Sequence, residues 1–227
     1  MKLLAIETAT EACSAALLID GEIELRYRIK PRGHSELLLG MMDDLLREAD
    51  LRPQQLDAMA FGRGPGSFTG VRIAAGVVQG AAYGADLPVV PVSTLAALAQ
   101  RAFREKGERS LLPSYDARMG ELYWAAYRVG EDELVRLVID EEVAPAERVR
   151  LPLDEGWYGI GSGWAAAGEL LGRRLEGVLL GYQADMFCSA REVALLGAAG
   201  FEQGRAVAPE AALPVYLRNK VAEKARL

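Results

Sequence analysis

The sequence predicts an α/β fold built from two lobes. Its first 104 residues follow the order strand, strand, strand, helix, strand, helix, strand, helix. A second set of strand and helix patterns starts after Lys106-Gly107 and does not cleanly repeat the first. The chain has 227 residues, 51% of them hydrophobic, which is enough for one large domain or two lobes around a real core.

The first three strands are expected to form an antiparallel meander. Leu3 to Ile6 is a short apolar run typical of a buried strand, and Cys13 to Ile19 is a second one. Asp20-Gly21 then indicates a tight hairpin turn. Glu22 to Ile29 alternates between apolar and polar side chains, as a strand with one buried face does.

Helical and strand patterns alternate over the rest of the first lobe. Ser35 to Ala49 is predicted to be a helix, and Leu37 and Leu39 make its apolar arc wider than one packed face needs. Its core stripe consists of Leu38, Met41, Met42, Leu45, Leu46 and Ala49. The elements that follow are a strand at 57–61, a helix at 71–85, a strand at 88–92 and a helix from Ser93-Thr94 to Arg104.

This order of elements is that of a ribonuclease H-like lobe, and actin, sugar kinases and heat-shock ATPases contain two such lobes. We therefore expect residues 1–104 to form an N-terminal lobe and residues 105–227 a diverged second lobe, whose C-terminal segment is free to return to the first. In the second half, strands are predicted at 111–115, 121–129, 134–141 and 158–160, and helices at 164–171 and 189–199.

A glycine-rich loop, Gly62-Arg63-Gly64-Pro65-Gly66-Ser67-Phe68-Thr69-Gly70, joins a predicted strand to a predicted helix. Such a loop turns sharply and lets its backbone approach another group closely. The N–H groups at the start of the helix suit a phosphate or carboxylate, so the loop is a candidate anion site. It matches neither the P-loop nor the dinucleotide fingerprint, and its spacing alone favours a simple strand-to-helix turn capped by Ser67 or Thr69 over an anion site.

The helix after this loop carries glycine at every fourth position, Gly76, Gly80 and Gly84. Each interior glycine costs about 1 kcal/mol relative to alanine, so a compensating contact is expected. A row of glycines lets two helix axes come unusually near. The row therefore predicts either close packing inside this chain or an interface with another chain.

Composition excludes several classes of function. The net charge is −6, which is unfavourable for binding nucleic acid alone, although Arg218, Lys220, Lys224 and Arg226 give a small basic tail. The two cysteines, Cys13 and Cys188, are expected to be buried thiols. His34 is the single histidine, so a metal site built on paired histidines cannot form. No apolar run reaches membrane-spanning length, and we expect a cytoplasmic protein.

Three segments together resemble one bacterial family. They are Ile6-Glu7-Thr8-Ala9-Thr10-Glu11-Ala12-Cys13-Ser14, the glycine-rich loop, and Asp116-Ala117-Arg118-Met119-Gly120-Glu121-Leu122-Tyr123-Trp124. With them the chain closely resembles the TsaB family, also called YeaZ, and Pro214-Val215-Tyr216-Leu217-Arg218 resembles the family's ending. The resemblance covers nearly the whole chain and is strongest over residues 3–98 and 114–125. The stretch Gly-Pro-Gly-Ser-Phe-Thr-Gly is specific to this family and its catalytic relative TsaD.

The resemblance implies a two-lobed fold of the actin and heat-shock ATPase superfamily. It also implies a non-catalytic role in making N6-threonylcarbamoyladenosine at position 37 of tRNAs that read codons starting with A. In that pathway TsaD carries the metal and the chemistry, TsaB is its paralogous partner, and the ATPase TsaE completes the complex. No cofactor of this chain itself is expected, a nucleotide is a possible ligand at the interface with partners, and tRNA is met only through the complex.

The family pairs with TsaD through the first two helices of the N-terminal lobe. Carried onto this sequence, the expected interface consists of Leu38, Met41, Met42, Leu45, Val71, Ala75, Val78, Gly80 and Tyr83. The candidate nucleotide or anion loop consists of Glu7, Gly64, Gly66, Ser67 and Thr69, and many family members carry Asp where this chain has Glu7. Without TsaD, the same two helices are expected to pair two copies of this chain.

The alternative interpretation is a hydrolase, either glycoprotease-like or an ATPase. A protease would need Ser67 and His34 as nucleophile and base, and nothing in the sequence places them together. An ATPase would need a magnesium ligand and a second phosphate loop, for which Glu7 and residues 161–163 are the candidates. We expect Asp116 and Arg118 to form an ion pair within their own lobe.

Overall fold

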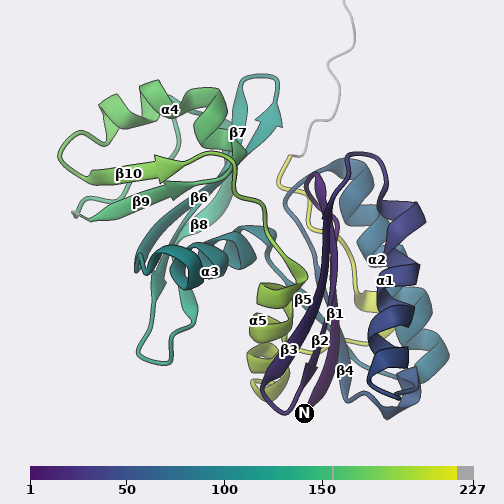
Figure 1. Cartoon of the computed structure of the whole chain (residues 1–227). Helices are drawn as coiled ribbons and strands as arrows, with labels where there is room; N and C mark the ends of the chain where they lie inside the picture. Colours follow the sequence, from purple (N-terminus) through teal and green to yellow (C-terminus); the bar gives the residue numbers. More distant parts are fainter. Residues whose placement is uncertain (155, 219–227) are drawn as a thin grey trace, which may run out of the picture.

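The computed structural model describes residues 1–154 and 156–218, and its two α/β lobes lie side by side (Figure 1). The first sheet has the order β3-β2-β1-β4-β5. Its strands are β1 (Lys2–Glu7), β2 (Ala12–Ile19), β3 (Glu22–Ile29), β4 (Ala58–Gly62) and β5 (Val89–Val92). β1, β2 and β3 pair antiparallel, whereas β4 pairs parallel with both β1 and β5.

The hairpin between β2 and β3 shows how local sequence sets the register. Asp20 and Gly21 both adopt positive φ, 47° and 96°, as a two-residue hairpin turn requires. Ile19 therefore lies opposite Glu22, and the pairing continues to Ala12 opposite Ile29. All six residues of β1 pair with β2, so the predicted antiparallel meander is confirmed.

Helices cover both faces of the first sheet (Figure 1). α1 (His34–Glu48) and α2 (Phe68–Ala85) pack on one face, and α5 (Ala190–Glu202) packs on the other. Between the sheet and α1 and α2 lies a core that includes Leu4, Phe61 and Met59. A short 3-10 turn, Pro53–Gln55, leads from α1 to β4, and another, Pro209–Ala211, lies against α2.

The second sheet repeats the strand order of the first. Its order is β10-β9-β6-β7-β8, so that β6, β7 and β8 form a meander and β9 and β10 add in parallel on the side of β6. The strands are β6 (Ser110–Arg118), β7 (Glu121–Val129), β8 (Val135–Pro145), β9 (Trp157–Ile160) and β10 (Leu179–Gln183), with α4 (Ser162–Arg174) between the last two. The expectation that the second half does not cleanly repeat the first was therefore wrong for the strands.

The divergence lies in the helices. The first lobe has α1 between its third and fourth strands, whereas the described residues between β8 and β9 form no helix. Strand β10 was missed in the sequence because it has five residues and a glycine, Gly181, at its centre. Such a segment shows neither alternation nor a continuous apolar run.

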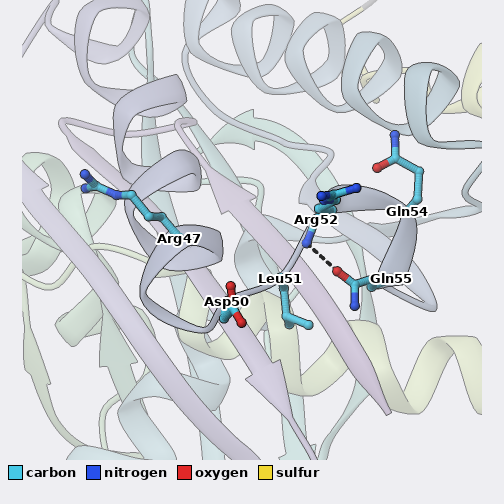
Figure 2. A pocket seen from close by; sticks show the side chains of 6 residues that line it. All are labelled: Arg47, Asp50, Leu51, Arg52, Gln54 and Gln55. Carbon is cyan, nitrogen blue, oxygen red and sulfur yellow. Dashed lines mark hydrogen bonds between the residues drawn. The ribbon is translucent and has the colours of Figure 1, made fainter.

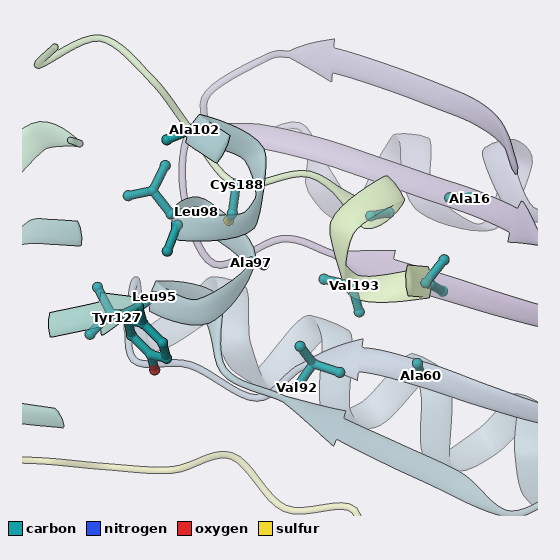
Figure 3. Close-up of a cluster of buried hydrophobic side chains, with 14 of the residues drawn as sticks. Ala16, Ala60, Val92, Leu95, Ala97, Leu98, Ala102, Tyr127, Cys188 and Val193 are labelled. Carbon is teal, nitrogen blue, oxygen red and sulfur yellow. The ribbon is translucent and has the colours of Figure 1, made fainter. Parts of the chain in front are cut away.

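The helix that follows the fifth strand of each lobe packs on the sheet of the other lobe. α3 (Thr94–Lys106) packs on β6, β7 and β8 of the second sheet, and α5 packs on β1, β2 and β4 of the first. α3 and α5 also contact each other, so the two lobes share one core at this place (Figure 3). The expected boundary between residues 104 and 105 separates the strands of the two sheets correctly. It assigns α3 to the first lobe and α5 to the second, however, whereas each of these helices packs on the sheet of the other lobe.

The superfamily fold predicted from the sequence is confirmed: two mixed α/β lobes, each with a five-stranded sheet, form a ribonuclease H-like pair. No helix in the described part of the chain combines the length and apolar character needed to span a bilayer. Residues 219–227, which include Lys220, Lys224 and Arg226 of the basic tail, lie outside the described residues.

Candidate functional site

The outer face of α2 is unusually flat. Gly76, Gly80 and Gly84 are all exposed, and a Cβ atom added to any of them would meet nothing within 4 Å. Packing against the described residues of this chain, one of the two explanations for the glycine row, is thereby excluded. The row is an open stripe without side chains along an 18-residue helix, and Tyr83, 79% exposed, stands next to its end. Such a stripe is suited to close approach by another helix.

The outer face of α1 adds an apolar side chain to this surface. α1 and α2 lie next to each other on the same face of the first sheet (Figure 1). Leu39 is 61% exposed and is followed by exposed Gly40 and, one turn further, by exposed Asp43. The two leucines that widened the apolar arc in the sequence therefore differ in environment: Leu37 packs partly into the core, whereas Leu39 is exposed.

Seven of the nine residues expected at the partner interface lie instead in the interior of the lobe. They are Leu38, Met41, Met42, Leu45, Val71, Ala75 and Val78, and none is more than 8% exposed. The six hydrophobic side chains of this set other than Val71 belong to the core under α1 and α2. The correction has a simple cause: an apolar stripe on a helix marks the face that is buried in its own lobe. Gly80 and Tyr83 are exposed as an interface requires.

The glycine-rich loop packs against the turn between β1 and β2. A Cβ atom at Gly66 would lie 2.6 Å from the carbonyl oxygen of Ala9, and one at Gly70 would collide with the carbonyl oxygen of Thr8. The amide of Ser67 donates to the Ala9 carbonyl at 2.7 Å. These close approaches account for the two glycines without a ligand.

The remaining groups of the loop are also used within the chain. The Ser67 hydroxyl accepts from the amide of Gly70 at 3.3 Å, which makes Ser67 the N-cap of α2, one of the two alternatives from the sequence. The Gly64 carbonyl accepts from the amide of Thr94 at 3.0 Å. Thr69 is exposed in the first turn of α2.

Glu7 is fully buried at the end of β1. One carboxylate oxygen accepts from the amide of Ala9, while the other is buried with no hydrogen-bond partner among the described residues. Desolvation raises the pKa of Glu7 to about 7, opposed by the amide of Ala9, the thiol of Cys188 and the amide of Thr8. A carboxylate in this position cannot reach a ligand in solvent, which corrects its expected place in a nucleotide or anion site.

Comparisons with known proteins decide the family. The family model described as "TsaD: tRNA N6-adenosine threonylcarbamoyltransferase" matches residues 28–225. The tRNA threonylcarbamoyladenosine biosynthesis protein TsaB of Escherichia coli is 42% identical over 99% of this chain and 97% of its own length. TsaB of Haemophilus influenzae is 37% identical over 99% of this chain and 96% of its own length.

A solved structure agrees with these sequence matches. YeaZ from Pseudomonas aeruginosa superposes with a TM-score of 0.88 at 45% identity, covering 95% of this chain and 99% of that one. This chain belongs to the TsaB family. The resemblance drawn from the three sequence segments is confirmed, and this TsaB protein belongs to tRNA threonylcarbamoyladenosine biosynthesis.

The groups that a hydrolase would need are engaged separately in this TsaB protein. His34 is buried, and its Nε2 lies 2.8 Å from the carbonyl oxygen of Thr10, whereas the Ser67 hydroxyl caps α2. No hydrogen bond joins the two side chains in the described part of the chain. Residues 161–163, the candidate second phosphate loop, press against β6, where a Cβ atom at Gly161 or Gly163 would collide with Ser114. Residues 1–154 and 156–218 contain no group of three or more potential metal ligands.

Between the lobes of this TsaB protein lies a hollow whose polar groups satisfy one another. The carboxylate of Glu141 in β8 accepts from Arg63 at 3.1 Å and from the Tyr127 hydroxyl at 3.0 Å, and it also bonds the Ser93 hydroxyl. Ser93 is in addition the N-cap of α3. This network ties the second sheet to the end of the glycine-rich loop and to α3, so we assign it to holding the lobes together.

A second hollow lies at the end of α1, where Arg47, Asp50, Leu51, Arg52, Gln54 and Gln55 line a shallow depression (Figure 2). The Arg52 amide donates to the side-chain oxygen of Gln55 at 2.8 Å, which closes the 3-10 turn. Apart from Leu51, the side chains that line this depression are polar, and they do not converge on one point (Figure 2). The outer face of α1 and α2 therefore remains the best candidate functional site.

Proposed function

We propose that this chain is the non-catalytic subunit that binds TsaD in the complex that modifies tRNA. The complex transfers a threonylcarbamoyl group from threonylcarbamoyl-AMP to N6 of adenosine 37 in tRNAs that read codons starting with A. In this proposal the chain scaffolds TsaD and supports the binding of TsaE. The metal and the chemistry belong to TsaD, and tRNA contacts this chain only within the complex, in the cytoplasm.

The observation that carries this proposal is the open glycine row on α2. Three glycines in the interior of a helix cost about 3 kcal/mol relative to alanine, and no contact within the described chain compensates for them. A partner helix that packs closely over Gly76, Gly80 and Gly84 would supply the missing contact. Exposed Leu39 on α1 offers an apolar side chain on the same face of the sheet. A partner built on the same fold could present two helices of matching shape.

The first experiment tests whether this face binds TsaD. Purified chain and TsaD are mixed, and the complex is measured by size-exclusion chromatography and calorimetry. Gly80→Glu should weaken binding by about 100-fold or more, because a charged side chain would be buried against the partner. Gly172→Glu is the matched control, since Gly172 lies in α4 of the second lobe and also faces open space. Equal binding by the Gly80→Glu variant and the unaltered chain would refute the assignment of this face.

The second experiment tests the role in the complex. Reconstituted tRNA modification with TsaD and TsaE should require this chain, and isolated chain should hydrolyse neither peptide nor ATP. Without TsaD, the same face is expected to pair two copies, so the Gly80→Glu variant should be monomeric at concentrations where the unaltered chain is a dimer. Full tRNA modification without this chain would overturn the proposed function.

A further inference from the structure

Two segments that the sequence analysis singled out, but to which it gave no role, contact each other, and one of them also contacts the start of α2. The first is the C-terminal segment 213–218, here called the strap, and the second is the turn between β6 and β7. The amide of Val215 in the strap donates to the carbonyl oxygen of Arg63 at 2.8 Å. Arg218, the last described residue, bonds the carboxylate of Glu121 and the carbonyl oxygen of Arg118. The strap thus links the glycine-rich loop to the second lobe.

Between these two anchors, the strap places Tyr216 against α2. The Tyr216 ring lies 6.1 Å from the ring of Phe68, centroid to centroid. The guanidinium of Arg72 lies 3.2 Å from the Phe68 centroid and 4.8 Å from the Tyr216 centroid. Both rings remain exposed, at 57% for Phe68 and 47% for Tyr216. An arginine that contacts two aromatic rings is held in position, because each ring attracts the cation.

Arg72 has no acidic side chain within ion-pair distance among the described residues. One of its nitrogens donates to the carbonyl oxygen of Phe68 at 3.1 Å, and the side chain is exposed. Its other donors have no partner among the described residues and can bind a carboxylate, for which the planar guanidinium has matching geometry. Orienting the arginine in advance lowers the entropy lost when such a carboxylate binds.

The position of Arg72 indicates where that carboxylate comes from. Phe68 and Arg72 continue the glycine row at the same spacing, since the row reads 68, 72, 76, 80 and 84. Side chains spaced by four residues form one ridge or groove on a helix. A partner helix that lies over the three glycines would therefore meet Phe68 and Arg72 at the N-terminal end of α2. Arg72 is therefore continuous with the proposed docking face of Gly76, Gly80 and Gly84. Its positive charge, which no described residue neutralises, is complementary to an acidic group.

We propose that the strap is part of the partner-binding face, and that a carboxylate of a TsaD helix binds Arg72 where it contacts Phe68 and Tyr216. The proposal rests on the proposed function, which supplies TsaD as the partner. It adds the chemistry of the contact, an acidic side chain at one end of the helix pair, and it assigns a role to the C-terminal segment. Because Arg218 fixes the strap to Glu121, the second lobe also helps to shape the face that TsaD meets.

The test measures the affinity of the full chain for TsaD by calorimetry at low and high salt. Arg72→Ala should weaken binding by about 10-fold or more at low salt and by less at high salt, since the contact is an ion pair in part. Arg72→Lys keeps the charge but loses the planar fork, so its affinity for TsaD should lie between those of the unaltered chain and the Arg72→Ala variant. Tyr216→Ala should also weaken binding, because the arginine loses one of its rings. Arg173→Ala, an exposed arginine of α4, is the matched control and should leave binding unchanged.

The outcomes separate this proposal from the proposed function. If Gly80→Glu abolishes the complex while Arg72→Ala binds within about twofold of the unaltered chain, the role of the strap is refuted and the docking face stands. If Gly80→Glu binds normally, the docking face itself is refuted. If the Arg72→Ala variant binds TsaD with unchanged affinity but the assembled complex binds tRNA more weakly, Arg72 contacts RNA and the proposal is refuted. Urea unfolding of each variant confirms that it remains folded.

Discussion

Glu7 offers the sharpest test of the structure, because replacing one buried atom should change how stability depends on pH. The substitution is Glu7→Gln, which keeps an oxygen to accept from the amide of Ala9 and removes the ionisable proton. Glu7 is fully buried, and none of the groups that oppose the rise in its pKa is a cation. Ionising this side chain in the folded protein therefore places a negative charge in the interior without a counterion.

The size of the effect follows from the pKa in the two states. The pKa of Glu7 rises from 4.5 to about 7 on folding. Between these values the folded chain keeps the proton and the unfolded chain has released it, so the free energy of unfolding decreases as pH rises. Each pH unit contributes about 1.36 kcal/mol, giving a loss of about 3 kcal/mol by pH 7, with no further loss from this group above it.

The assay is urea unfolding of both proteins from pH 4.5 to pH 8, compared as the difference between their free energies of unfolding. Other groups titrate equally in both proteins and cancel. The difference should be near zero at pH 4.5 and should grow to about 3 kcal/mol in favour of Glu7→Gln at pH 8. Glu11→Gln, at an exposed position nearby, controls for the loss of one carboxylate. A difference that does not change with pH, or a less stable Glu7→Gln variant at pH 8, would refute the reasoning.

Three further substitutions test other parts of the structure. Gly80→Ala should stabilise the isolated chain by about 0.5–1 kcal/mol, because the added methyl group has open space, yet weaken binding to TsaD; thermal unfolding and calorimetry measure the two effects. Gly70→Ala should lower the free energy of unfolding by about 1–3 kcal/mol, since its methyl group would collide with the Thr8 carbonyl, and urea unfolding would detect an unchanged stability that contradicts this. Glu141→Ala should destabilise the chain by about 2 kcal/mol by leaving Arg63 and Tyr127 without their shared acceptor; an intact transition midpoint would argue against a role for this network between the lobes.

Periodicity predicted the first lobe well, because each of its elements carries a strong local signal. The predicted strand from Glu22 to Ile29 has the bounds of β3, although its last residue, Ile29, is exposed rather than buried, and Ser93 caps α3 as expected. The exchange of α3 and α5 could not be predicted in the same way. An amphipathic helix reveals that one of its faces is apolar, but it does not reveal which sheet covers that face.

The candidate interface shows the same limit at the level of residues. Leu38 and Met42 were placed in the core stripe by periodicity but at the partner interface by the family resemblance, and they lie in the core. The face that is actually open carries glycines, which give no hydrophobic signal. What the sequence did contain was the spacing 68, 72, 76, 80 and 84, a single row on one helix. Tyr216 completes that row from a segment more than a hundred residues away, and only the fold brings it there.

The glycine-rich loop shows why a motif can identify a family without identifying a ligand. Glycine is required where another group comes too close for a side chain. In the first lobe that group is the chain's own turn between β1 and β2, which fills the space at Gly66 and Gly70. In the second lobe Ser114 fills the space at Gly161 and Gly163 in the corresponding way. A substitution that adds a methyl group at any of these positions must displace backbone or buried side chain, so packing alone is a sufficient reason for these glycines, whatever the family's ancestor once bound there.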